Sequence, residues 1–171
     1  MQDFVNTRNY FRGGDLLGDV EEAAVRLAER GLLEEGKRIG EAERRRLVEF
    51  REGLRGLLMA HTGVTGGDAE ALNYIVSSAA LRVRFGVDGR PDLEPEGKGG
   101  LVERIVGRLL AEVVQAEAEG RWERLKACRN EGCSWAFYDA SKNRSGSWCN
   151  MDICGARHKM RAYRERKSGS S

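Results

Sequence analysis

The chain has 171 residues, of which 40% are hydrophobic and 33% are charged, and its net charge is only +2. This length corresponds to about one domain, or to one domain with a small module, and the hydrophobic content excludes a wholly disordered chain. No apolar run approaches the ~20 residues that span a bilayer, and the N-terminus does not resemble a secretory signal. We therefore expect a cytoplasmic protein without a membrane segment.

The first 80 residues are predicted to be mostly helical. Apolar residues recur at helical spacing over residues 20–28, and a stronger apolar stripe extends from Leu47 to Leu58. Asp68 is well placed to cap a further helix that contains Leu72.

The periodicity then changes to that of a β-hairpin. From Leu81 onward apolar residues alternate with arginines, which predicts a half-buried strand, and the Asp-Gly pair at 88–89 is typical of a tight turn. A return strand near Leu93 would complete the hairpin, although the only two prolines of the chain weaken it. Helical spacing returns over residues 101–120, and a further helical turn is expected over 122–127.

All four cysteines lie within a short window near the C-terminus, in the order Cys128-x4-Cys133-x15-Cys149-x4-Cys154. Two close pairs separated by a mid-length loop are typical of a four-thiolate zinc site. Two disulfides are the alternative, which a reducing cytosol disfavours. Because four thiolates leave no open coordination position, we predict one structural Zn²⁺ rather than a catalytic one.

The nearly neutral total charge hides an asymmetric distribution. Residues 1–120 contain 17 Lys and Arg against 22 Asp and Glu, whereas residues 121–171 contain 12 against 5. A helix is expected from about residue 152 to 167, and a basic helix beside a zinc site is suited to DNA. In the alternative interpretation, Met160 and Tyr163 pack on the zinc core and the basic side chains are merely solvated.

No catalytic site is predicted. The glycines at 13, 14 and 18 do not lie between a strand and a helix, so they do not indicate a phosphate-binding loop. His61 has no neighbouring Cys, Ser or paired carboxylate in the sequence and is interpreted as a helix-end residue. We therefore do not expect an enzyme.

The residues around the cysteines form a specific motif. It comprises the cysteine spacing, the aromatic residues after the second cysteine, a Trp before the third, and Cys-Gly-Ala-Arg at 154–157. This motif resembles the CGNR zinc-finger family, with Ala156 in place of the family Asn. The resemblance implies that the four cysteines bind zinc and that aromatic residues pack around the metal, namely Trp135, Phe137, Tyr138 and Trp148.

Short motifs in the front of the chain point to a partner domain. They are Asp3-Phe-Val-Asn6-Thr7, Arg51-Glu-Gly-Leu-Arg55, Leu72-Asn73 and the predicted hairpin. They resemble the ABATE domain, a stress-response regulator domain found with this finger. The resemblance implies a bacterial transcriptional regulator with a sensor-like domain over residues 1–120 and a finger over 121–171, and we expect the two to have separate cores.

These observations predict a mainly α fold, in which a helical N-terminal domain with one β-hairpin precedes a small four-cysteine zinc finger that has a basic helix and a flexible end. The leading functional prediction is a nucleoid-associated, DNA-binding transcriptional regulator; the alternative is a zinc-stabilised RNA-binding or protein-docking module. Double-stranded DNA is the expected partner, and a small-molecule effector and a homodimer are further candidates. The candidate DNA contacts are Arg144, Arg157, Lys159, Arg161, Arg164 and Arg166. The candidate residues for a ligand pocket are Asn6, Arg51 and Asn73.

Overall fold

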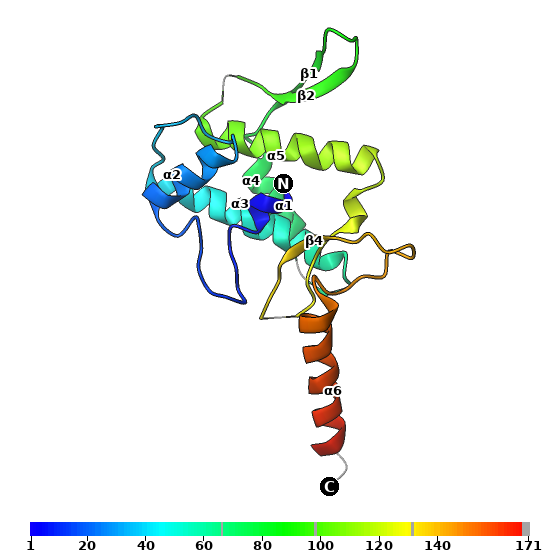
Figure 1. The fold of residues 1–171 in the computed structure, drawn as a ribbon. Coiled ribbons are helices and arrows are strands. Elements are labelled where there is room, and N and C mark those ends of the chain that lie inside the picture. The colour runs from blue at the N-terminus through cyan, green and yellow to red at the C-terminus, as the bar shows by residue number, and fades with distance from the viewer. Residues whose placement is uncertain (66, 98, 131, 169–171) are drawn as a thin grey trace.

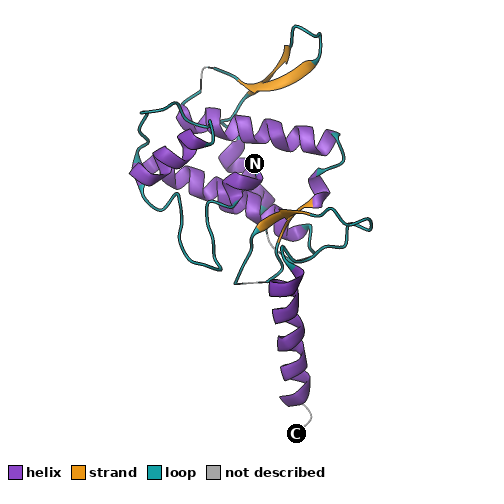
Figure 2. Cartoon of the chain, in the orientation of Figure 1, coloured by secondary structure: helices purple, strands orange, loops and turns teal. Residues whose placement is uncertain are grey.

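The computed structural model describes residues 1–65, 67–97, 99–130 and 132–168, and it is mainly α-helical as predicted (Figures 1 and 2). The expected flexible end falls on residues 169–171, which lie outside the described residues. In chain order the elements are α1 (Gln2–Val5), α2 (Val20–Glu29), α3 (Glu41–Ala60), α4 (Ala69–Val76), β1 (Leu81–Phe85), β2 (Pro91–Pro95), α5 (Leu101–Ala118), η1 (Trp122–Arg124), β3 (Leu125–Ala127), β4 (Ala136–Tyr138), η2 (Met151–Gly155) and α6 (Ala156–Ser168).

The long helix α3 lies at the centre of the helical body. The Glu43 carboxylate accepts the N–H of Gly40 at 2.7 Å and so stabilises the first turn of the helix. One face of α3 then carries apolar side chains at helical spacing, and these form the core with α1, α2, α4 and α5. The buried members of this face are Leu47, Phe50, Leu54 and Leu58.

Helix α4 begins where the sequence predicts. The carboxylate of Asp68 accepts the N–H groups of Glu70 and Ala71, both at 3.0 Å, so the predicted N-cap is confirmed. Among the residues of α4, Leu72 is the one that is buried, and it packs into the common core.

The predicted hairpin is present, but it is not half-buried. Strands β1 and β2 pair antiparallel with Val83 opposite Leu93, and the prolines occupy the two ends of β2. Val83 and Phe85 are 60% and 68% exposed, because the outer part of the hairpin projects beyond α5 (Figure 1). Its base contacts α5, where Pro95 packs closely against Gly107.

The helical turn expected over residues 122–127 is replaced in its second half by a strand. After η1 the chain extends as β3, which pairs antiparallel with β4, so that Ala127 lies opposite Ala136. Both alanines are fully buried in the same apolar core as the helices. The finger has a separate cluster of buried side chains around its cysteines, but these two small alanines let its strand pair pack directly in the core of the helical body.

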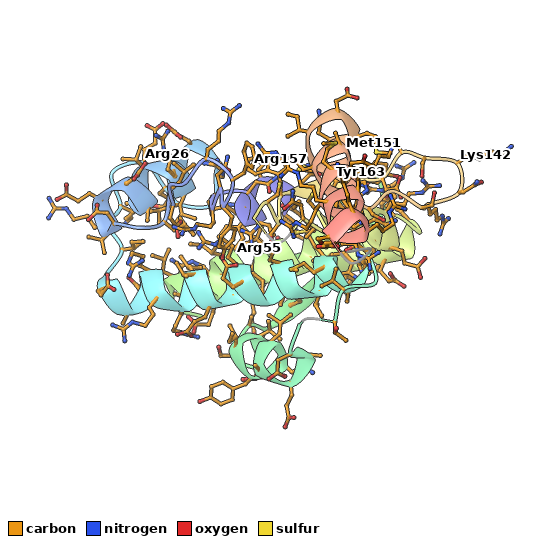
Figure 3. All side chains as sticks on the ribbon, turned by 90° about the horizontal axis from the view of Figure 1, so that it is seen from below. Arg26, Arg55, Lys142, Met151, Arg157 and Tyr163 are labelled. Carbon is orange, nitrogen blue, oxygen red and sulfur yellow. The ribbon has the colours of Figure 1, made fainter. Side chains whose placement is uncertain are left out.

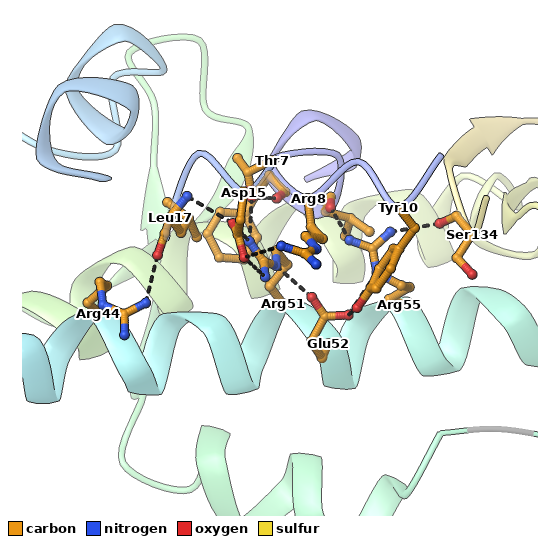
Figure 4. A network of polar contacts seen from close by, with 12 residues as sticks. Thr7, Arg8, Tyr10, Asp15, Leu17, Arg44, Arg51, Glu52, Arg55 and Ser134 are labelled. Carbon is orange, nitrogen blue, oxygen red and sulfur yellow. Dashed lines mark hydrogen bonds and ion pairs between the residues drawn. The ribbon is translucent and has the colours of Figure 1, made fainter. Parts of the chain in front are cut away.

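A network of charged groups fastens the N-terminal loop to α3 (Figure 4). The Arg51 side chain is 2% exposed, and its guanidinium binds the Asp15 carboxylate at 2.5 and 2.8 Å and the Thr7 hydroxyl at 3.2 Å. Burial raises the pKa of Asp15, but the hydrogen bonds from Arg51 and from the Leu17 N–H more than offset it, so this pKa lies below its usual value. The paired guanidinium and carboxylate hold the loop in place.

We expect Asp15→Asn to lower the free energy of unfolding by about 2–3 kcal/mol at pH 7, because it removes a charge partner from a buried guanidinium. The pKa of Asp15 is lower in the folded than in the unfolded state. Its contribution is therefore complete above the unfolded pKa near 3.9 and is lost as the pH falls through the folded value. Urea denaturation followed by circular dichroism measures both effects.

The matched control is Glu35→Gln, which removes the same charge from an exposed side chain. This control should change the free energy of unfolding by no more than about 0.5 kcal/mol. Equal losses in the two variants would show that the Arg51–Asp15 pair does not stabilise the loop.

Candidate metal centre and nucleic-acid interface

The four cysteines converge on one point. The Sγ atoms of Cys128, Cys133, Cys149 and Cys154 all lie within 4.8 Å of one another. Cys133 Sγ lies 3.5 Å from Cys149 Sγ, and Cys149 Sγ lies 3.8 Å from Cys154 Sγ. A tetrahedron with Zn–S bonds of about 2.3 Å has edges of about 3.8 Å. The sulfur cluster thus has the size and donor set of one structural Zn²⁺ site.

Three of the cysteines in this cluster affect one another's pKa. Hydrogen bonds with Cys128 raise the pKa of the Cys133 thiol and, together with Cys133, the pKa of the Cys149 thiol, while they lower the pKa of Cys128. Four thiolates cannot gather at these distances without a compensating charge. A bound Zn²⁺ supplies this charge and holds all four sulfurs as ligands.

Short-range hydrogen bonds shape the second cysteine pair. Asn150 accepts the N–H of Ile153 through its side chain at 2.9 Å and the N–H of Cys154 through its carbonyl at 2.9 Å. This turn becomes η2, from which α6 continues directly. A Cβ at Gly155 would overlap the Met151 sulfur, so a larger residue at this position requires that exposed side chain to move.

Three of the four predicted aromatic residues pack against the cysteines, namely Trp135, Phe137 and Trp148. The prediction is wrong for Tyr138, which is 43% exposed, because alternation along β4 places its side chain on the opposite face from Phe137, away from the cysteines. The Trp148 ring also lies against the His158 ring of α6, with centroids 4.8 Å apart. Trp148 therefore connects the metal centre with the first turn of α6.

The loop over residues 139–147 is organised by a buried ion pair. Lys126 and Asp139 have side chains 5% and 4% exposed, and Lys126 Nζ lies 2.7 Å from Asp139 Oδ2. Lys126 also donates to the carbonyls of Arg144 and Gly146, at 2.6 and 3.1 Å. The loop is thereby held in one conformation, and Lys142 lies at its outer tip (Figure 3).

Helix α6 projects away from the rest of the molecule (Figure 1). It contains six Lys and Arg against one Glu, and none of its residues is buried. Met160 and Tyr163 are 52% and 55% exposed, so the interpretation that they pack on the zinc core is wrong. Beyond its first turn, the surface of α6 is therefore available to a partner.

A basic hollow forms where α6 leaves the zinc-binding loops, and we call it the elbow. It encloses about 240 Å³ and is lined by Arg129, Asn130, Trp148, Arg157, His158, Arg161 and Glu165. Among the described residues, no carboxylate pairs with Arg129 or Arg161. Arg129 is not among the candidate DNA contacts selected from the sequence. Its position directly after the zinc ligand Cys128 is the feature that could have identified it.

The candidate DNA contacts selected from the sequence lie in three places. Arg144 lies in the 139–147 loop, with its guanidinium 3.4 Å from the Glu123 carboxylate. The guanidinium carbon of Arg157 stands over the Phe11 ring, 4.3 Å from its centroid, and so faces the N-terminal loop. The others lie farther along α6, namely Lys159, Arg161, Arg164 and Arg166.

The three residues selected for a ligand pocket are not brought together around a cavity. Arg51 is engaged by Asp15, and Asn73 lies exposed on α4. Asn6 pairs with the backbone of Ala136, accepting its N–H at 2.8 Å and donating to its carbonyl at 2.9 Å. Asn6 and Arg51 therefore have structural partners within the fold and do not line a common pocket.

Several further contacts fix the strand pair to α3. Arg55 donates to the carbonyl of Ser134 at 2.7 Å, and Thr62 donates to that of Ala127 at 3.3 Å. His61 ends α3 as expected, and its Nδ1 contacts the Leu125 carbonyl at 2.7 Å. The metal centre is thus anchored to the central helix of the body.

This geometry defines a class of protein: a zinc finger with four sulfur ligands and a projecting basic helix, packed on a helical domain. Residues 124–167 match the CGNR zinc finger family. Residues 1–122 match the ABATE family, described as "Putative stress-induced transcription regulator". Because this match covers most of the chain, the protein belongs to the ABATE family and combines its domain with a CGNR zinc finger. No curated protein sequence matches the chain.

Both families are described by regulatory or metal-binding features rather than by an enzymatic activity. Within the described part of the chain, no helix has both the length and the apolar composition that crossing a bilayer requires.

We expect elemental analysis of reduced, freshly purified protein to find one zinc per chain, and Cys149→Ser to lose the metal. Because β3 and β4 belong to the common core, the loss should also lower the thermal midpoint of the helical body by several degrees. Calorimetry of the two proteins measures this effect.

The control is Ser147→Ala, which alters an exposed hydroxyl close to the cluster without removing a sulfur. It should retain both zinc and thermal midpoint. Zinc binding to Cys149→Ser with unchanged stoichiometry and affinity would contradict the four-sulfur site.

Proposed function

We propose that the protein is a DNA-binding transcriptional regulator, whose zinc finger places α6 and the elbow against the phosphate backbone of a duplex. The observation that carries this proposal is the combination of six cationic residues on α6 with the absence of burial along that helix. A 13-residue helix with such a charge excess is marginal in water, because beyond the ring contacts of Arg157 and His158 at its base it has no buried side chain and only one acidic residue against six basic ones. A polyanion supplies the missing charges.

The distribution of positive charge supports a surface wider than α6 alone. The helix is about 20 Å long at 1.5 Å per residue, and the elbow adds Arg129 at its base. Lys142 adds a further charge at the tip of the rigid 139–147 loop. The 120 N-terminal residues contain an excess of acidic residues, so duplex binding would involve the C-terminal end and leave the body away from the DNA.

The contacts between α3 and the finger supply a route for regulation. Arg55 in α3 donates to the carbonyl of Ser134, two residues before β4, and Thr62, just after α3, donates to that of Ala127 in β3. Asn6, at the end of α1, pairs with the backbone of Ala136 in β4. A change in the helical body that displaced α3 would therefore alter the position of the metal centre. We propose that the N-terminal region regulates the finger in this way, with the protein acting at the nucleoid.

The direct test is a salt titration of the affinity for a short duplex, measured by fluorescence anisotropy with the zinc-loaded chain. Each neutralised phosphate contributes about −0.9 to the slope of log K against log salt, so three to five contacts predict a slope of about −3 to −5. Arg129→Ala and Arg161→Ala should each weaken binding and reduce the size of this slope by about one unit.

Arg90→Ala is the matched control, because it removes an exposed arginine from the tip of the hairpin, far from α6 (Figure 1). It should leave the slope unchanged. Absence of duplex binding at low salt would refute the proposal. Tighter binding of single-stranded RNA than of the duplex would favour the RNA-binding alternative.

A further inference from the structure

A second basic hollow lies on the helical body, away from the finger. It has a volume of about 540 Å³ and is formed by four segments: the α2–α3 loop, the first turn of α3, the base of the hairpin and the first two turns of α5. In Figure 1 the hairpin lies on the upper side of the body, whereas α6 leaves from the lower side. The hollow is therefore distinct from the elbow, and we call it the body cavity.

The lining of the body cavity has more positive than negative charge. It contains five Lys and Arg against three Glu. The acidic groups already have partners: Glu94 pairs with Arg82 at 2.7 Å, Glu34 lies 3.9 Å from Lys37, and Glu43 caps α3 through the Gly40 N–H. The paired groups therefore leave the cations in excess.

Three guanidinium groups account for this excess. Arg104 donates to the carbonyl of Gly99 at 2.8 Å, and Arg108 donates to the carbonyl of Gly31, so both are bound only to uncharged groups. Arg38 makes no such bond, and no carboxylate in the described ranges lies within ion-pair distance of any of the three. Gathered around one hollow, they form an anion-binding arrangement, because each retains N–H groups that can donate to an oxyanion.

The cavity also offers apolar surface beside these cations. Leu32, Leu33, Leu101 and Pro95 contribute to its lining, and Leu33 is buried at its base. Small-molecule sites commonly enclose about 300–1,000 Å³ and combine apolar walls with a few charged or polar groups. We propose that the body cavity binds a small organic anion, with a carboxylate or phosphate group held by Arg38, Arg104 and Arg108 and an apolar portion against the leucines.

This assignment does not depend on DNA binding, but it bears on regulation. Helix α3 extends from Glu43 at the cavity to Arg55 at the finger, with Thr62 just after its end. Helix α5 extends from Leu101 at the cavity towards β3. Two continuous helices thus connect the proposed ligand with the anchoring contacts of the metal centre. Arg38 lies just before α3, and Arg104 and Arg108 lie near the start of α5. An anion bound by all three therefore acts on the N-terminal ends of both helices.

Phenyl phosphate is the probe, because it carries a phosphate and a ring of suitable size. It is titrated into the ¹⁵N-labelled, zinc-loaded full chain, and the Nε–Hε signals of the arginine side chains are followed by NMR. We expect saturable changes at Arg104 and Arg108, weaker binding of inorganic phosphate, and no saturable binding of phenol. Absence of saturation by phenyl phosphate at millimolar concentration, or changes confined to α6 and the elbow, would overturn the proposal.

Arg38→Gln is the most informative variant, because Arg38 makes no intramolecular bond whose loss would disturb the fold. It should weaken the binding of phenyl phosphate by about tenfold, and the Arg104→Gln and Arg108→Gln double variant should weaken it further. Arg45→Gln, an exposed arginine of α3 outside the cavity, is the control and should bind as the wild type does. Unchanged affinity for phenyl phosphate in both Arg38→Gln and the double variant would reject the site. The affinity of the same variants for a DNA duplex tests the finger separately.

Discussion

Two guanidinium groups buried near the middle of α3 determine how the rest of the chain is arranged. A buried cation is costly unless charged or polar groups surround it, so each arginine draws in a segment that is distant in sequence. Arg51 holds the loop that contains Asp15, while Arg55 binds Glu52 and the carbonyls of Val5 and Ser134. One helix thereby orients both the N-terminus and the entrance to the metal centre (Figure 4).

The C-terminal region relies on a different physical principle. Few of its residues pack in an apolar core, so a metal with four sulfur ligands and the buried Lys126–Asp139 pair hold its loops. Its strands nevertheless belong to the core of the helical body through Ala127 and Ala136. The finger therefore combines a local, metal-dependent centre with a base that is supported by the larger domain.

The features that could be predicted from sequence are those with a regular spacing or a strong local preference. The cysteine spacing predicted the sulfur cluster, helical periodicity predicted α3 and α5, and Asp68 marked the start of α4. Long-range polar pairing has no such pattern. The sequence therefore draws attention to Asn6 and Arg51 but does not identify their partners, Ala136 and Asp15. Three-residue strands such as β3 are equally hard to predict, since they are too short for alternation to be evident.

The absence of buried residues in α6 has a consequence for how this protein changes over evolutionary time. A substitution in α3 disturbs buried charges and the common core, whereas one beyond the first turn of α6 removes little packing, because none of the residues of α6 is buried. The surface of α6 can therefore acquire new side chains at little cost in stability. Related chains could thus diverge in what they recognise while the body, the sulfur ligands and the contacts between them remain the same.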